Sequence, residues 1–151
     1  AIAAPAGLVI WLMANIHIGS QSLLAHGAAL LQPLGHLIGL DGYILMAFIL
    51  GLPANEIVLP ILMMSYMAEG AMLELDSVQE IANLFAANGW TGLTALNVML
   101  FSLLHFPCGT TLWTIRKESG SFRWAAFGAL MPTCIAILVC FLTTQIYRLI
   151  L

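Results

Sequence analysis

The sequence predicts an all-α membrane protein: a polytopic bundle of about four spans with broken helices, plus an amphipathic interfacial helix and a short extramembrane helix. Of its 151 residues, 62% are apolar and only 7% are charged, and the mean hydropathy is +1.02. Soluble domains carry about 25% charged residues. So few charges cannot cover a water-exposed surface, so most of the exterior must face lipid. Apolar stretches of about 20 residues, the length of a membrane-spanning helix, separate the charged positions.

The first 40 residues predict one span followed by an interfacial helix. They contain no Asp, Glu, Lys or Arg, yet polar side chains from Asn15 to His26 interrupt the apolar character. We therefore expect a span over residues 1–16 and an amphipathic stretch over residues 20–31, lying at the membrane surface. Pro33 and Gly35 are expected to end that stretch.

The middle of the chain predicts an interrupted apolar segment and then a polar one. Asp41 is a suitable cap for the segment at residues 43–67, which a Gly/Pro-containing break divides. Residues 68–89 hold four of the seven acidic side chains and no basic one. Within them, Ser77 and Glu80 form a capping-box pattern that predicts a short amphipathic helix ending near residues 88–89.

The last third predicts two more spans joined by a polar turn. Residues 90–115 form one span with a second break, residues 116–120 are the turn, and the final span runs to about Tyr147 with Pro132 inside it. Three of the four basic residues lie at or beside this turn, namely Arg116, Lys117 and Arg123. The positive-inside rule places the turn in the cytoplasm and the acidic segment outside.

Several classes of function are disfavoured by composition and motifs. The net charge is −3 with only four basic residues, so the chain has no cluster that could neutralise nucleic-acid phosphates. No phosphate-binding glycine loop, nucleophile elbow or zinc-protease motif is present. We therefore predict a non-enzymatic protein with no catalytic residues. Its three cysteines, an odd number, do not suggest a disulfide framework.

The first break contains the residues Gly51, Pro53, Asn55 and Glu56. Pro53 removes a backbone donor, Gly51 loosens the chain, and Asn55 is a suitable N-cap for a new half-helix starting at Glu56. Interrupted spans mark binding sites, because unpaired backbone is tolerated in a bilayer only where protein or a cavity satisfies it. A carboxylate at membrane depth costs about 2.5–3.5 kcal/mol and indicates cation binding or proton relay. The structural alternative is a kink in which Glu56 only complements the helix dipole.

The second break places His105 and Cys108 on either side of Pro107, and Gly109 with two threonines, Thr110 and Thr111, follows. Imidazole and thiolate suit borderline metals such as ferrous iron, and an unwound segment adds free carbonyls. The spacing is not an established zinc pattern. A packed cysteine and a hydrogen-bonded histidine are the alternative interpretation.

Five short motifs, in this order, resemble the C-terminal membrane region of the ferrous iron transport protein B (FeoB) family. They are A-A-P-A-G-L at 3–8, G-L-D-G at 39–42, G-L-P-A-N-E-I-V at 51–58, N-G-W-T at 88–91 and H-F-P-C-G-T-T at 105–111. Each motif is weak alone, and their order and spacing are specific. The resemblance covers nearly the whole chain. It identifies residues 1–115 as the second of two Gate, or nucleoside-recognition-like, repeats and residues 116–151 as a cytoplasmic turn with a terminal membrane helix.

The resemblance implies a multi-pass protein of the bacterial inner membrane through which Fe(II) passes, with no covalently bound cofactor. GTP and Mg²⁺ would act only through an N-terminal GTPase domain that these residues lack. The implied partners are the bilayer, that domain, the first Gate repeat and small accessory iron-transport proteins, and a homo-oligomer is also compatible. Cys108, Glu56, His105 and Asn55 would lie near the ion path. Two alternatives stay open: a transporter of nucleosides or another small solute, and a membrane anchor that transports nothing.

Overall fold

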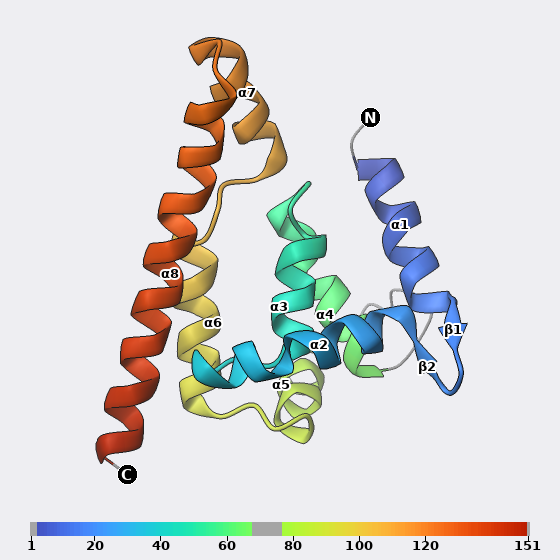
Figure 1. Ribbon diagram of the computed structural model, residues 1–151. Coiled ribbons are helices and arrows are strands. Elements are labelled where there is room, and N and C mark those ends of the chain that lie inside the picture. The colour runs from blue at the N-terminus through green and yellow to red at the C-terminus, as the bar shows by residue number, and fades with distance from the viewer. Residues whose placement is uncertain (1–2, 68–76, 151) are drawn as a thin grey trace.

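The computed structural model describes residues 3–67 and 77–150, whose regular secondary structure is helical apart from one short hairpin (Figure 1). The elements in order are α1 (Ala3–Asn15), β1 (His17–Ile18), β2 (Gln21–Ser22), α2 (Leu23–Leu37), α3 (Gly42–Leu50), η1 (Asn55–Ile57), α4 (Val58–Met67), α5 (Val78–Ala87), α6 (Gly92–Leu104), α7 (Gly109–Ser119) and α8 (Phe122–Ile150). The predicted all-α membrane class is confirmed.

Two helical segments are long and apolar enough to cross a membrane. They are Gly92–Ser119, which contains α6 and α7, and the 29-residue α8. A third candidate is the pair of α2 and α3, bent by 112°. The sequence analysis expected about four spans. In the described residues α1, α3 and α4 have only 13, 9 and 10 residues, each fewer than the roughly 20 that a straight span needs.

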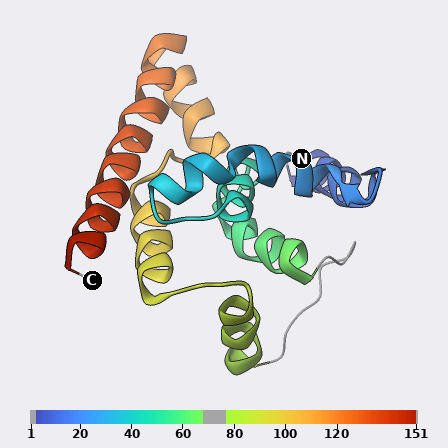
Figure 2. The same cartoon turned by 60° about the horizontal axis from the view of Figure 1, so that its bottom comes forward.

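The helices form an upright group with α2 lying across it (Figure 1). Helices α6 and α8 lie side by side and run in opposite directions, and α7 folds back along α8 (Figures 1 and 2). The turn between α7 and α8 and the helix α5 lie at opposite ends of this pair (Figure 1). Helix α2 packs against α3 at a steep angle, as a helix at the membrane surface would against one that enters the bilayer.

Side-chain caps fix the starts of several helices, as the sequence predicted for two of them. The Asp41 carboxylate accepts a hydrogen bond from the Ile44 N–H at 2.7 Å, and the Ser77 hydroxyl accepts one from the Glu80 N–H at 3.2 Å. None of the ten residues of α5 is buried. Most of the acidic segment before it, including Glu69, Glu74 and Asp76, lies outside the described residues.

Helix α2 begins later and ends later than expected. The stretch 17–22 forms an antiparallel hairpin, and the hydroxyl of Ser22 caps the helix that follows. The helix then continues through Pro33 to Leu37, so the prediction that Pro33 and Gly35 end it was wrong. The end of α2 is packed closely against the N-cap of α3: a Cβ on Gly35 would lie 2.9 Å from the backbone carbon of Asp41. This contact and the packing of α2 on α3 hold the helical path despite the donor that proline lacks.

The polar turn near the end of the chain is shorter than expected. Residues 116–119 continue α7, and the reversal occurs at Gly120, whose φ of +64° is left-handed. Glycine adopts this conformation without a Cβ penalty. Helix α8 extends past Tyr147 to Ile150, and the Arg148 guanidinium donates to the His36 carbonyl at 2.9 Å.

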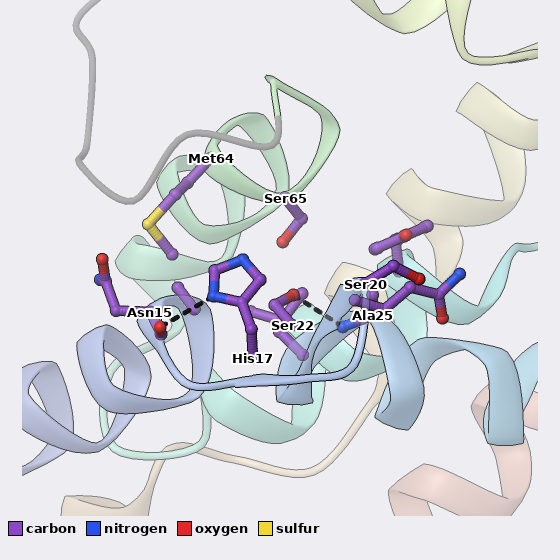
Figure 3. Close-up of a pocket in the computed structure, with 11 residues that line it drawn as sticks. Asn15, His17, Ser20, Ser22, Ala25, Met64 and Ser65 are labelled. Atoms are coloured by element: carbon purple, nitrogen blue, oxygen red, sulfur yellow. Dashed lines mark hydrogen bonds between the residues drawn. The ribbon is translucent and has the colours of Figure 1, made fainter.

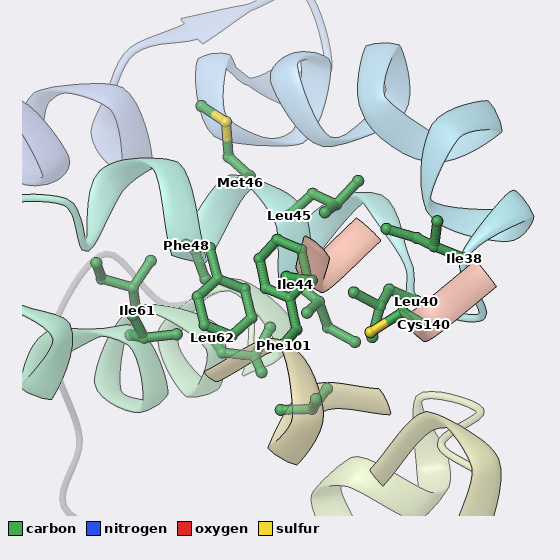
Figure 4. Close-up of a cluster of buried hydrophobic side chains, with 14 of the residues drawn as sticks. Ile38, Leu40, Ile44, Leu45, Met46, Phe48, Ile61, Leu62, Phe101 and Cys140 are labelled. Carbon is green, nitrogen blue, oxygen red and sulfur yellow. The ribbon is translucent and has the colours of Figure 1, made fainter. Parts of the chain in front are cut away.

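Helix α3 lies at the centre of the apolar core. Ile44 and Ala47 of α3 are fully buried, and Ile61 of α4, Phe101 of α6 and Cys140 of α8 pack around it (Figure 4). An apolar helix surrounded on most sides by other helices needs no polar face, which explains why α3 lacks amphipathic patterning.

A buried polar node joins α6 and α8 to the turn between α2 and α3. The Asn97 amide nitrogen donates to the Ile38 carbonyl at 2.9 Å and to the Thr144 hydroxyl at 2.8 Å. The Thr143 hydroxyl donates to the Asn97 amide oxygen at 2.6 Å. Gly39, with φ of +69°, passes so close that a Cβ there would lie 2.4 Å from both Asn97 and Thr144. Sequence analysis did not identify this node.

A second polar node joins the starts of α3 and α6 to the end of α4. The Tyr66 hydroxyl donates to the Asp41 carboxylate, and the Trp90 indole N–H donates to Tyr66 at 2.9 Å. Asp41 therefore caps α3 with one oxygen and receives Tyr66 with the other.

Candidate functional site

The first break begins where α3 ends, and there the backbone passes close to the start of α4. The N–H of Gly51 donates to the Ala47 carbonyl at 2.8 Å, and the Ala54 N–H donates to Gly51 at 3.0 Å. A Cβ on Gly51 would lie 2.4 Å from the Val58 side chain. Glycine is therefore required here because the start of α4 folds back against the end of α3.

Beyond this turn, the chain does not start a half-helix at Glu56 capped by Asn55, as expected. Asn55–Ile57 form the single turn η1, and its N-cap is Ala54 without a side-chain hydrogen bond. Ala54, whose backbone is in the β region, is the residue before the turn, and Asn55 is the first residue within it. The Asn55 side chain therefore does not serve as the cap. Asn55 and Glu56 are exposed, and the Asn55 side chain is left available for a cavity described below.

The second break interrupts the long segment between α6 and α7, as predicted. Residues 105–108 are not helical, and Cys108 is the N-cap of α7 without a side-chain cap bond. His105 is buried, at 7% exposure. Its ring lies 4.9 Å from that of Phe48 and is stacked on Phe101 at 5.6 Å between centroids. The imidazole therefore lies inside the aromatic core, where α3 meets α6.

The thiol of Cys108 is associated with the two threonines that follow it. Its Sγ atom lies 3.0 Å from the Thr110 hydroxyl oxygen and 3.2 Å from that of Thr111. Cys108 is partly exposed. A thiol and two hydroxyls at the N-terminus of a helix form a compact group of polar donors and acceptors that faces the positive end of the helix dipole.

The structure brings the two breaks into direct contact. The N–H of Gly109 donates to the Leu52 carbonyl at 2.8 Å, and a Cβ on Gly109 would meet Leu52 and Pro53 at ordinary contact distances of 3.5–3.8 Å. Pro53 and Gly109, which the sequence indicated as helix breakers, thus lie side by side. The backbone of each break supplies a hydrogen-bond partner for the backbone of the other.

Two cavities adjoin this junction. One of about 440 Å³ is lined by residues of both breaks and of α8, and another of about 570 Å³ is bounded mainly by apolar side chains of α3, α4 and α6. Four residues line both cavities and therefore lie between them, namely Asn55, Ser102, Leu103 and His105. Ser102 and the α8 residues Gly128 and Pro132 were missed as site residues, although the proline inside the last span was a visible signal.

The predicted ligands do not form one metal centre. Within residues 3–67 and 77–150, no three His, Cys, Asp or Glu side chains come together to hold a metal ion. His105 and Asn55 share cavities, Cys108 is grouped with Thr110 and Thr111, and Glu56 is exposed in η1. Any cation at this junction would depend on neutral oxygen donors as well as on these residues.

A further cavity of about 280 Å³ lies away from the breaks. Residues of α1, the hairpin, α2, α3 and α4 surround it, with His17 at its centre and Met64 and Ser65 above (Figure 3). His17 Nδ1 donates to the Asn15 carbonyl at 2.9 Å. This cavity shares no lining residue with the junction of the two breaks.

Comparison with known proteins agrees with the motif pattern. The model of the Gate family, described as nucleoside recognition, matches residues 1–122. The Fe(2+) transporter FeoB of Staphylococcus aureus strain MSSA476 is 32% identical over 149 residues, which cover 92% of this chain and 21% of that protein. The Fe(2+) transport protein A/Fe(2+) transporter FeoB fusion protein of Porphyromonas gingivalis is 29% identical over 141 residues, which cover 89% of this chain and 16% of that protein.

The Fe(2+) transporter FeoB of Synechocystis sp. is 26% identical over 140 residues, covering 91% of this chain and 22% of that protein. The chain thus spans between about a sixth and a little over a fifth of the length of these relatives. No solved structure matches the chain. Because the family match covers most of the chain, the chain belongs to the Gate family, and it is similar to a region of proteins named FeoB along about nine tenths of its length.

Proposed function

We propose that this chain forms part of the path by which Fe(II) crosses the bacterial cytoplasmic membrane. The observation that carries the proposal is the junction of the two helix breaks, where the Gly109 N–H meets the Leu52 carbonyl beside Cys108. Broken helices that meet inside a membrane protein provide backbone and side-chain donors at membrane depth. The names of the similar proteins supply the identity of the ion.

In this proposal, the ion passes through and is not chemically changed. The thiol of Cys108, with its two threonine hydroxyls, replaces part of the hydration shell of Fe(II). Glu56 lowers the cost of a divalent cation near the low-dielectric interior. Asn55, His105 and the free carbonyls contribute neutral donors, so that the ion stays weakly enough bound to leave.

The relatives are several times longer than this chain, which leaves room for the further parts that the family resemblance implies. Residues 1–115 would be one Gate repeat, and residues 116–151 a cytoplasmic turn with a terminal membrane helix. We propose that a GTPase domain, which would bring GTP and Mg²⁺, and a first Gate repeat complete the multi-pass transporter, with accessory iron-transport proteins or a second copy as further partners. The α7–α8 turn with Arg116, Lys117 and Arg123 would face the cytoplasm.

The test is Fe(II) uptake by cells that express a complete transporter carrying this region with Cys108→Ser. We expect uptake to fall on the order of tenfold or more, because a hydroxyl is a much poorer ligand than a thiolate for a borderline metal. Cys134→Ser is the matched control, since Cys134 is exposed on α8. Membrane abundance is measured in parallel. Wild-type uptake by Cys108→Ser at normal abundance would contradict the role of this thiol.

A second candidate function is uptake of a nucleoside or a similar polar solute. It is favoured by another cavity of about 440 Å³, lined by the aromatic residues Tyr43, Tyr66 and Trp90 and by the amides Gln32 and Asn88. Aromatic and amide groups around a cavity suit a planar polar ligand. Uptake of labelled uridine and adenosine by the same cells tests this alternative, and saturable uptake that Cys108→Ser leaves intact would support it over iron.

A further inference from the structure

The turn between α7 and α8 gathers most of the positive charge of the chain. Arg116, Lys117 and Arg123 are three of its four basic residues, and Glu118 is the one acidic residue among them. All four side chains are exposed, and the turn lies at the end of the bundle opposite α5 (Figure 1). None of the three basic side chains forms a salt bridge within the part of the chain that the structure describes. Their charges can therefore meet an external negative group.

Two aromatic rings hold the guanidinium of Arg116 at this turn. Its central carbon lies 5.6 Å from the centroid of the Trp113 ring and 5.9 Å from that of Phe122. Trp113 belongs to α7 and Phe122 begins α8, so the guanidinium contacts both arms of the turn. The rings restrict where it can lie, but they cannot replace the strong acceptors that its five N–H groups can bind. Arg116 is thus positioned and still needs an anionic acceptor.

An exposed apolar stripe on α8 begins beside the turn. Trp124 is 62% exposed and Phe127 is 56% exposed, and their rings meet edge to face at 6.2 Å between centroids. Met131 and Leu138 are exposed further along the helix, and their spacing places them on the same side as Phe127. Helix α8 is long and apolar enough to cross a membrane. Tryptophan and basic residues at the end of such a span mark the level of the phospholipid headgroups.

We propose that the turn between α7 and α8 binds anionic phospholipids, with Arg116 as the main phosphate-binding residue and Lys117 and Arg123 as supporting charges. A lipid phosphate can accept two parallel hydrogen bonds from one guanidinium. Each basic residue close to an anionic membrane surface strengthens binding by about fivefold, so three of them discriminate between anionic and zwitterionic lipids. The inference is independent of iron transport, because none of these residues lies in the proposed ion path.

A phospholipid fits this surface better than an acidic protein partner does. An acidic protein would match the cations but not the apolar stripe that begins at Trp124 and Phe127. A phospholipid matches both, because its headgroup meets the cations while its acyl chains cover the stripe. The indole N–H groups of Trp113 and Trp124 can also donate to lipid oxygens while the rings stay in apolar surroundings. In the orientation proposed above, these lipids belong to the cytoplasmic leaflet.

Tryptophan fluorescence of the chain in lipid nanodiscs tests the proposal. The discs contain phosphatidylcholine with a small share of phosphatidylglycerol, and bromine is carried either by the phosphatidylglycerol or by an equal share of the phosphatidylcholine. Bromine quenches tryptophan at short range, and Trp113 and Trp124 are exposed beside the turn. At low salt we expect the quenching to report an enrichment of phosphatidylglycerol of about tenfold or more. High salt should reduce it severalfold, because exposed charges are screened.

Charge variants assign the lipid preference to the turn. The triple variant Arg116→Gln, Lys117→Gln, Arg123→Gln should lose the preference and keep its helix content in circular dichroism, because all three side chains are exposed. Arg148→Gln is the matched control, since Arg148 is the fourth basic residue and lies near the other end of α8. It should keep the wild-type preference. Arg116→Lys keeps the charge but loses the planar fork of donors, so the preference should fall severalfold.

Three outcomes would contradict the proposal. Equal quenching by the two brominated lipids in the wild type would overturn it and leave a protein partner as the occupant of the turn. A triple variant that keeps the preference, or an Arg148→Gln variant that loses as much of it, would show that the lipid binds elsewhere. Wild-type preference in Arg116→Lys would remove Arg116 as the main phosphate-binding residue. Fe(II) uptake enters none of these measurements, so this inference and the proposed function can fail separately.

Discussion

The backbone N–H of Gly109 donates to the carbonyl oxygen of Leu52 at 2.8 Å, and this bond joins two helix breaks that are far apart in sequence. Gly109 is the first residue of α7, and Leu52 lies two residues beyond the last residue of α3. Neither the Gly109 N–H nor the Leu52 carbonyl can find a hydrogen-bond partner within its neighbouring helix. Where a chain crosses a bilayer, such groups must be satisfied inside the protein, so each break depends on the other.

Gly109→Pro is expected to separate the breaks without disturbing α7. Proline is well accepted at the first position of a helix, but it removes the N–H that Leu52 accepts. We expect a loss of about 1 kcal/mol in the free energy of unfolding and reduced Fe(II) uptake. The matched control is Gly109→Ala, whose Cβ would find ordinary contacts of 3.5–3.8 Å. Equal effects of the alanine and proline variants would show that the hydrogen bond does not matter.

Glu56→Gln is expected to reduce Fe(II) uptake while leaving membrane abundance unchanged. Glu56 is exposed in η1, beside the first break, so the neutral amide removes an attractive charge without disturbing packing. A reduction of about tenfold, equivalent to about 1.4 kcal/mol, is expected in initial uptake rates. Glu118→Gln, at the exposed end of α7, is the control. Rates that are the same in both variants would remove Glu56 from the pathway.

Asn97→Ala is expected to destabilise the protein by about 1–3 kcal/mol, because it leaves buried partners unsatisfied. The lost amide bonds to the Ile38 carbonyl and to the hydroxyls of Thr143 and Thr144. Denaturant unfolding in detergent measures the change. Asn88→Ala provides the comparison, since the Asn88 amide makes an exposed hydrogen bond to the Leu84 carbonyl. A smaller loss at position 97 than at position 88 would contradict the role of the node.

Gly39→Ala is expected to disrupt the same node sterically. Gly39 has φ of +69°, and a Cβ there would lie 2.4 Å from the Asn97 amide nitrogen and the Thr144 hydroxyl. Gly19→Ala is a close control, since φ is +73° and nothing lies within 4 Å of its Cβ position. The control should show only left-handed strain, about 1–2 kcal/mol. The Gly39 variant should unfold at a clearly lower temperature, and equal melting of the two would refute the steric argument.

The helix breaks and caps could be predicted from sequence because each depends on local chemistry. Pro53 and Pro107 have no backbone N–H to donate, whatever their surroundings. The side chains of Asp41 and Ser77 each accept a hydrogen bond from the N–H three residues later, in the helix that follows. The same local reasoning failed at Pro33, where packing of α2 on α3 maintains the helix. It also failed at Asn55, because Ala54 and not Asn55 is the N-cap.

The sequence by itself determined that this chain is a helical membrane protein with two broken segments, since apolar composition and missing backbone donors act locally. Only the tertiary structure decided that the breaks touch, that Pro132 of α8 lies at the same cavity as His105, and that Asn97 reaches the turn before α3. The physical reason is that each of these contacts joins segments that are far apart in the sequence. Their proximity depends on how the helices pack, and no local pattern of residues encodes it.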